Sequence, residues 1–169
     1  GSEMCIRDRP MYASPETMKT LRTMYGWAFE SGKARTGYVR PEPYEVTEPF
    51  RVGSVLATPL PVDHAAVDTC AYMLESGGRR LVYMPDVKSI PEASLERMKG
   101  ADLLIIDGLR YDLHPTHMCL DESLAAIRAI EPGQAFLTHL SHNMDYRILS
   151  GRLPENVGAA YDGLRLSLP

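Results

Sequence analysis

The sequence has few cysteines and no pattern that pairs them. Cys5, Cys70 and Cys119 are an odd number, they lie far apart, and no two of them form a CxxC motif. A disulfide framework is therefore not expected, and free thiols in this pattern are typical of a reducing compartment. We predict a cytoplasmic location. We expect Cys119 to be a small buried residue rather than a nucleophile.

Long apolar runs and an excess of basic charge are also missing. No apolar stretch approaches the length of a membrane-spanning helix and no secretory leader is visible, so we expect no membrane partner. The net charge of -4 argues against general binding to a nucleic-acid backbone. A hydrophobic content of 44% against 24% charged residues is that of a globular chain, and 169 residues can enclose one sizeable core.

The first nine residues differ in character from the rest. Residues 1–9 have no apolar period, and they match the translation of a transposase adaptor used to prepare sequencing libraries. We therefore expect this segment to be non-native and exclude it from the fold. Residues 10–169 are then expected to form one partial domain, whose native sequence begins further upstream.

The remaining pattern alternates predicted strands and helices, which indicates an α/β fold. Ser14 and Pro15 are typical of a helix start, and apolar spacing extends this helix to about Glu30. The polar segment Gly32–Pro43 is predicted to be a surface loop or lid. Further strands are predicted at 10–13, 44–50, 51–60, 70–75, 79–84, 101–107, 134–139 and 164–168, and further helices at 91–99, 120–130 and 143–149.

A histidine or an aspartate closes or soon follows four of these strands. The residues are His64, Asp86, Asp107 and His139. Ligand groups in α/β folds gather beyond the carboxyl ends of the strands, so these residues predict one shared site. Imidazole and carboxylate donors without paired thiolates suit Zn, Mn or Fe.

Several motifs, in order along the chain, resemble the later two thirds of a metallo-β-lactamase-fold hydrolase. They are TPLPVDH (58–64), YMLE (72–75), YMPD (83–86), ID (106–107), PTH (115–117), LTHLSH (137–142) and YDGL (161–164). Within that superfamily they resemble the phosphoribosyl cyclic phosphate phosphodiesterases of phosphonate breakdown. The pairing of THLSHxxD with an upstream PLPxxH is fairly specific. The resemblance implies an α/β fold that is the carboxyl-terminal portion of an αββα sandwich.

The resemblance also implies a metal site and a donor to the substrate. His64 matches the ligand of a first metal, Asp86 a carboxylate that bridges two metals, and His139 the ligand of the second, with Zn or Mn as the pair of divalent ions. His117 matches a histidine over the substrate phosphate, where it would give a proton or a hydrogen bond to the departing oxygen.

Other polar residues near these motifs are expected to support the site or to be structural. His142 and Asp145 are predicted to orient His139 and the following helix. Asp107 either supports the site in the same way or caps the following loop, and both interpretations stay open. His114 is expected to be a structural hydrogen-bonding residue. Asp86 departs from the family pattern, because Pro85 and Val87 flank it where small hydroxyl residues are usual.

The superfamily's HxHxDH motif occurs nowhere in the 169 residues. The resemblance places that motif upstream of a segment like Pro10–Ala13, so we expect only three of the metal ligands here and an inactive fragment with an exposed sheet edge and apolar surface. The expected parent is a hydrolase that uses a hydroxide held by two metal ions to cleave a small, cyclic phosphate ester.

Two alternative functions remain open from the sequence. An RNA-processing nuclease of the same superfamily would need a basic groove or an RNA-binding arm, and the acidic balance favours neither. A non-catalytic binding protein of the same fold would not need His64, Asp86 and His139 to converge. The expected partner is a small-molecule phosphate ester, and a homodimer is left open.

Overall fold

The computed structural model describes residues 8–29 and 40–168. These residues belong to two compact units, one within 1–49 and one within 50–169, and each is described by itself. Most of the predicted adaptor segment and of the predicted lid therefore lie outside the described residues. No helix in the described part of the chain is long and apolar enough to cross a membrane.

The amino-terminal unit contains a two-stranded parallel sheet and a capped helix. Strand β1 (Asp8–Ala13) begins two residues before the predicted strand and pairs with β2 (Arg40–Glu45). Helix α1 (Pro15–Met24) starts as predicted, because the Ser14 hydroxyl accepts a hydrogen bond from the Thr17 amide.

Two predicted boundaries in this unit are wrong. The predicted helix to Glu30 is interrupted: α1 ends at Met24 and a separate α2 covers Gly26–Phe29, where the glycine is a poor helix former. The predicted strand at 44–50 is displaced, since β2 already begins at Arg40. The two prolines of β2 are typical of a loop, and for that reason the segment was predicted as one. Proline is tolerated on an edge strand, because an edge strand donates fewer backbone hydrogen bonds.

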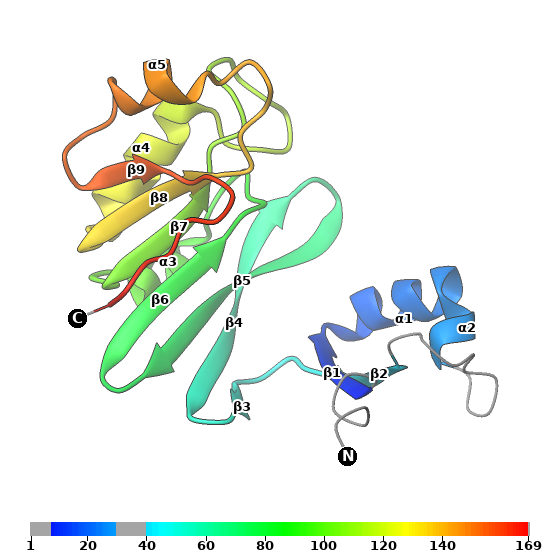
Figure 1. Cartoon of the computed structure of the whole chain (residues 1–169). Coiled ribbons are helices and arrows are strands. Elements are labelled where there is room, and N and C mark those ends of the chain that lie inside the picture. The colour runs from blue at the N-terminus through cyan, green and yellow to red at the C-terminus, as the bar shows by residue number, and fades with distance from the viewer. Residues whose placement is uncertain (1–7, 30–39, 169) are drawn as a thin grey trace. The chain divides into compact units, whose positions relative to one another are not determined.

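The larger unit is built on a seven-stranded mixed sheet with the strands in sequence order from β3 to β9 (Figure 1). The strands are β3 (Phe50–Val52), β4 (Val55–His64), β5 (Val67–Ser76), β6 (Arg79–Met84), β7 (Leu103–Asp107), β8 (Gln134–Thr138) and β9 (Val157–Ala159). Pairs from β3 to β6 are antiparallel, and pairs from β6 to β9 are parallel. Strands β4, β6, β7 and β8 therefore run in one direction and end at one edge of the sheet.

Helices cover one face of this sheet. In the view of Figure 1, α3 (Glu92–Met98) and α4 (Leu120–Ile130) lie behind the strands, and α5 (Tyr146–Ser150) follows β8. The core forms on this face: the fully buried side chains include Val82, Met84, Met98, Leu104, Ile106 and Ile130. Tyr83, which points from β6 to the other face, is 43% exposed. The α/β class is as predicted.

The carboxyl-terminal prediction is wrong in detail. Residues 157–159 form β9, which was not predicted because three residues carry no periodic signal. Residues 164–168 form no strand, although Leu164, Leu166 and Leu168 are half-buried and the two residues between them are exposed. Alternating apolar residues indicate that one side of a segment is buried. Here that burial occurs although the segment does not pair with another strand.

Gly158 allows β9 to lie close to β8, and this contact gives a stability prediction. A Cβ atom at this position would lie 2.6 Å from Cε1 of the Phe136 ring. Gly158→Ala should therefore lower the free energy of unfolding by roughly 1–3 kcal/mol, the usual cost of overpacking. Urea denaturation followed by circular dichroism measures the change. Gly151→Ala is the matched control in the same unit, because the added Cβ meets nothing closer than 3.6 Å; equal stability of the two variants would contradict the packing argument.

Candidate metal centre

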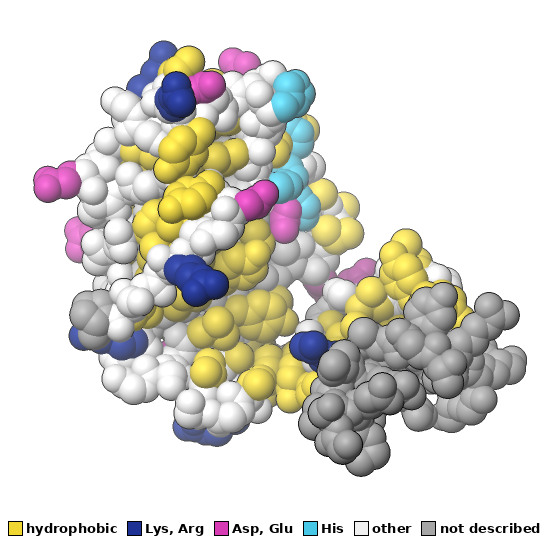
Figure 2. All heavy atoms as spheres, viewed as in Figure 1, with side chains coloured by type: hydrophobic (Ala, Val, Ile, Leu, Met, Phe, Trp, Pro, Cys, Tyr) yellow, Lys and Arg dark blue, Asp and Glu magenta, His cyan; other side chains and the backbone are white. Residues whose placement is uncertain are grey.

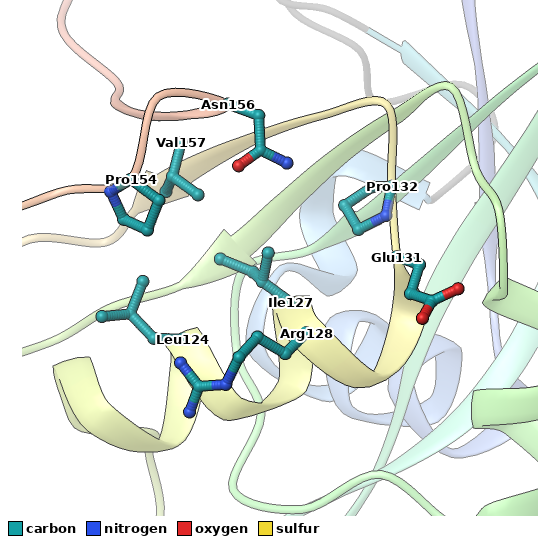
Figure 3. Close-up of a pocket in the computed structure, with 8 residues that line it drawn as sticks. All are labelled: Leu124, Ile127, Arg128, Glu131, Pro132, Pro154, Asn156 and Val157. Carbon is teal, nitrogen blue, oxygen red and sulfur yellow. The ribbon is translucent and has the colours of Figure 1, made fainter.

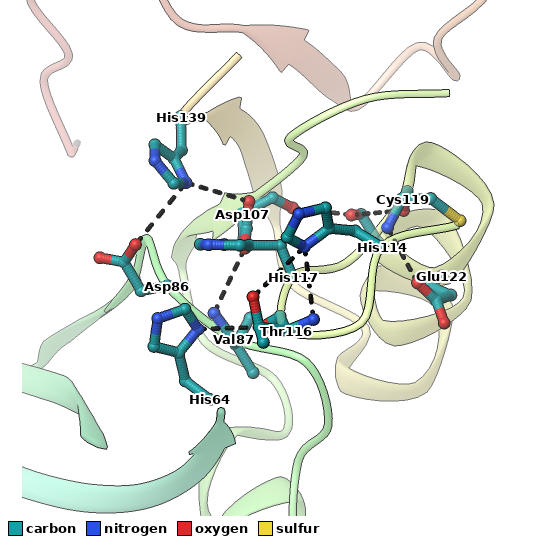
Figure 4. Close-up of polar contacts among 11 residues, drawn as sticks. His64, Asp86, Val87, Asp107, His114, Thr116, His117, Cys119, Glu122 and His139 are labelled. Carbon is teal, nitrogen blue, oxygen red and sulfur yellow. Dashed lines mark hydrogen bonds and ion pairs between the residues drawn. The ribbon is translucent and has the colours of Figure 1, made fainter. Parts of the chain in front are cut away.

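The four predicted strand-end residues meet at one edge of the larger sheet. His64 ends β4, Asp107 ends β7, and the other two lie just beyond β6 and β8. Because these four strands share a direction, their carboxyl ends bring the side chains together, and His117 joins them from the loop before α4 (Figure 4). His64 and His139 each lie near Asp86, as expected, and their roles as metal ligands stay a prediction. Figure 2 shows histidine side chains gathered along one edge of this unit.

The side chains form two overlapping groups of potential metal ligands. One ligand atom each from His64, Asp86 and His117 lies within 4.8 Å of the others, and the same holds for Asp107, His117 and His139. The Nδ1 atom of His139 lies 3.6 Å from Asp86 Oδ1 and 3.5 Å from Asp107 Oδ1. His117 is common to both groups, and its ring centroid lies 4.5 Å from that of His64 and 4.8 Å from that of His139.

The hydrogen bond of His64 determines which of its ring nitrogens is free. Its Nδ1 lies 2.8 Å from the backbone carbonyl oxygen of Thr116, which can only accept, so Nδ1 carries the proton. In the neutral ring Nε2 then holds a lone pair. Metal-ligating histidines commonly use this arrangement, with the second nitrogen bonded to a carbonyl or carboxylate. The sequence did not predict this contact, because a backbone carbonyl has no side-chain signature.

Asp107 is completely buried at the end of β7. Its Oδ2 atom lies 2.7 Å from His117 Nδ1 and accepts a 3.3 Å hydrogen bond from the Val87 amide. Among the described residues, its buried Oδ1 has no hydrogen-bond partner. A buried carboxylate oxygen is costly to leave unpaired, and the nearby His139 nitrogen is the group that would satisfy it after a small movement. Of the two interpretations left open for Asp107, these contacts favour support of the site.

The loops that carry Asp86 and His117 are joined to each other. The Met118 amide donates to the Val87 carbonyl at 2.8 Å, and Lys88 Nζ lies 2.6 Å from Glu122 Oε1 on α4. Partial burial would raise the pKa of the Glu122 carboxyl, but hydrogen bonds from Lys88 and from the Cys119 amide outweigh it and hold the pKa below its ordinary value. The carboxylate therefore stays charged and keeps the two loops connected at neutral pH.

His139 adopts an unusual backbone conformation. Its φ angle is +59°, in the left-handed region that residues other than glycine seldom occupy. Strained positions of this kind cost of order 1 kcal/mol or more, and they cluster at functional sites. The turn is held beyond it, where the Ser141 amide donates to the Leu109 carbonyl at 2.9 Å. With this backbone conformation the imidazole nitrogen Nδ1 lies 3.6 Å from Asp86 Oδ1 and 3.5 Å from Asp107 Oδ1.

The two predicted supporting residues lie further along the same segment. Asp145 Oδ1 accepts hydrogen bonds from the amides of Arg147 and Ile148, so it caps α5. His142 is exposed. The structure describes no contact between either side chain and His139, and their influence on that residue stays a prediction. Cys119 is buried as expected.

A separate surface pocket lies between α4 and β9 and contains none of the clustered residues (Figure 3). Leu124, Ile127 and Val157 supply apolar walls, and Arg128 and Glu131 supply its charged groups. The pocket has no histidine or cysteine. It therefore offers no second set of metal-binding groups to compare with the cluster at the sheet edge.

Comparison with known proteins identifies the family. The model of the beta-lactamase superfamily domain matches residues 2–140. The crystal structure of a diphosphatase from the PhnP family aligns with a TM-score of 0.82 and 30% identity, covering 93% of this chain and 57% of that one. Zn-bound PqqB from Methylobacterium extorquens aligns with a TM-score of 0.69 and 22% identity, covering 94% of this chain and 64% of that one, which shows a shared fold.

A curated relative carries a different name. The octanoyltransferase of Porphyromonas gingivalis is 26% identical over 161 residues, which are 94% of this chain and 32% of that protein. The chain thus spans about a third of this relative and 57% of the diphosphatase. The family match, the mixed α/β architecture and the histidine and aspartate cluster agree with one another. The chain belongs to the metallo-β-lactamase superfamily, as its motifs predicted, and is similar to the PhnP family within it.

Proposed function

We propose that this domain belongs to a metal-dependent hydrolase that cleaves a small phosphodiester. The observation that carries the proposal is the convergence of two carboxylates and three imidazoles at the carboxyl edge of the sheet, in a chain of this superfamily. Its 30% identity to a diphosphatase of the PhnP family supports phosphorus chemistry. Oxygen and nitrogen donors without thiolates suit Zn²⁺ or Mn²⁺.

The residues fit a pair of divalent ions. His64 would bind through Nε2, which its hydrogen bond to the Thr116 carbonyl leaves unprotonated. Asp86 would bridge the two ions, and His139 would bind the second. When bound, the ions would supply Lewis acidity and activation of water at neutral pH. The side chains of Asp86 and His139 are 46% and 43% exposed, so solvent and substrate can reach them.

His117 would act on the substrate, and Asp107 would hold it in position. The carboxylate accepts the Nδ1 proton of His117, so Nε2 is the nitrogen that is available to exchange a proton with the leaving oxygen. The His117 side chain is 13% exposed, which limits competition from water at this nitrogen. Asp107 does not contact the substrate in this scheme. It acts through the orientation of His117.

The first test supplies the motif that the resemblance implies. A protein in which an upstream segment containing HxHxDH replaces residues 1–9 should hydrolyse bis-p-nitrophenyl phosphate when Mn²⁺ or Zn²⁺ is added, because the motif would complete the coordination of both ions. Release of p-nitrophenolate measures the activity. The control carries alanine at the motif's histidines. A folded protein with the intact motif that shows no hydrolysis with any divalent metal would count against the hydrolase assignment.

The second test separates the roles of His139 and His117 in that completed protein. His139→Ala should reduce both metal content and turnover, because the ion loses a donor. His117→Ala should keep the metal content and reduce turnover by roughly a hundred- to ten-thousand-fold, as for a lost general acid. Elemental analysis and steady-state kinetics give the two readouts. A substrate whose leaving group needs no proton should partly rescue His117→Ala alone; loss of metal from that variant would reverse the assignment.

A further inference from the structure

His114 is the histidine beside the cluster to which neither the motifs nor the ligand groups assign a role. It lies in the loop between β7 and α4, three residues before His117, and its ring centroid is 5.1 Å from that of His117 with the ring planes tilted by 54° (Figure 4). The ring is half-buried. It therefore lies next to His117 but belongs to neither of the two groups of potential metal ligands.

The hydrogen bonds of His114 give it the tautomer opposite to that of His64. Its Nδ1 lies 3.3 Å from the amide nitrogen of Thr116 and 3.3 Å from the hydroxyl of the same residue. A backbone amide can only donate, so Nδ1 must accept and the neutral ring carries its proton on Nε2. The backbone of Thr116 thus leaves His64 with a free lone pair and His114 with a free N–H donor.

The His114 N–H group is unused and its loop is held in place. Within the described residues, Nε2 of His114 has no hydrogen-bond partner, and it is not completely enclosed by the protein. The Arg110 guanidinium binds the carbonyls of Asp112 and Leu113, and the Leu120 amide donates to the Arg110 carbonyl at 2.9 Å. Because the loop is already ordered by these hydrogen bonds, the donor would lose little conformational entropy on binding a ligand.

The charge state of His114 agrees with a single donor. Partial burial lowers the pKa of its imidazole, and the positive charge of Arg110 and the neighbouring His117 lower it further. The ring is therefore neutral at pH 7. It offers one N–H group and no positive charge, so it can bind a phosphate oxygen as a neutral hydrogen-bond donor.

We propose that His114 is a substrate-binding residue that donates its Nε2 proton to a non-bridging oxygen of the phosphate group, beside the leaving oxygen that His117 would contact. The inference rests on the proposed function and deepens it. It assigns the two histidines of the HPTH segment different tasks: His117 exchanges a proton through an Nδ1-bonded ring, and His114 only holds the anion. The ligand class is a phosphate ester with at least one free anionic oxygen.

The test measures phosphate binding rather than catalysis. Inorganic phosphate is titrated into the 169-residue chain, with and without Zn²⁺, while long-range ¹H–¹⁵N spectra follow the histidine rings and calorimetry gives the dissociation constant. We expect the free chain to show His114 protonated at Nε2 and His64 at Nδ1, and phosphate to shift the His114 Nε2 resonance. His114→Phe should weaken phosphate binding roughly ten- to hundredfold, the value of a hydrogen bond to a charged group.

His114→Gln is the matched variant, because its amide nitrogen can occupy nearly the same place as Nε2. It should bind phosphate within about threefold of the unaltered chain if the donor is what matters. Equal binding by the unaltered chain and His114→Phe, a His114 ring protonated at Nδ1, or no phosphate binding at all would each overturn the inference. Phosphate binding that depends on His114, in a completed protein that hydrolyses no phosphodiester, would instead overturn the proposed function alone.

Discussion

The arrangement of the site depends on one buried carboxylate, that of Asp107. A carboxylate with no exposure is costly unless it is hydrogen-bonded, and here Oδ2 is bonded to the His117 ring and the Val87 amide, while Oδ1 faces the His139 imidazole nitrogen at 3.5 Å. The bond to His117 fixes the orientation of that ring, which is the proposed acid. The bond to the Val87 amide fixes the start of the loop after Asp86. Because β7 is a central strand of the sheet, the position of this carboxylate is set by the packing of the core.

The Val87 contact also explains a departure from the family pattern. The residues flanking Asp86 are apolar, so no side-chain hydroxyl is available there to support the site. The structure uses the backbone instead: the Val87 amide binds Asp107, and its carbonyl accepts a hydrogen bond from Met118. Backbone groups give the same directional bonds as hydroxyls and need no particular side chain. The apolar neighbours are therefore compatible with an ordered loop.

The sequence was sufficient for the elements whose signals are local. Helix α4 has the predicted bounds, and the polar residues that end apolar runs do meet at one edge, because strand direction follows from the order of strands and hairpins. Other features could not be predicted from the sequence. The prolines of β2 imitate a loop, β9 is too short for a periodic signal, and the role of Asp107 depended on which side chains surround it. The opposite tautomers of His64 and His114 arise from a backbone carbonyl and a backbone amide, and neither leaves a trace in the residue pattern.

The site divides into a rigid part and a loose part. His64, His117 and Asp107 are held by hydrogen bonds of 2.7 to 2.8 Å, whereas Asp86 and His139 approach each other only to 3.6 Å and are about half exposed. Among the described residues, the Asp86 carboxylate has no hydrogen-bond donor. His139 meets it from a strained backbone conformation. A carboxylate and an imidazole that face each other without a good hydrogen bond keep their lone pairs available, and that is the condition under which a cation binds at little cost in broken contacts. In the proposed function, the rigid part would hold His64 for one ion and His117 for the substrate, and the loose part would be free to adjust to the other ion.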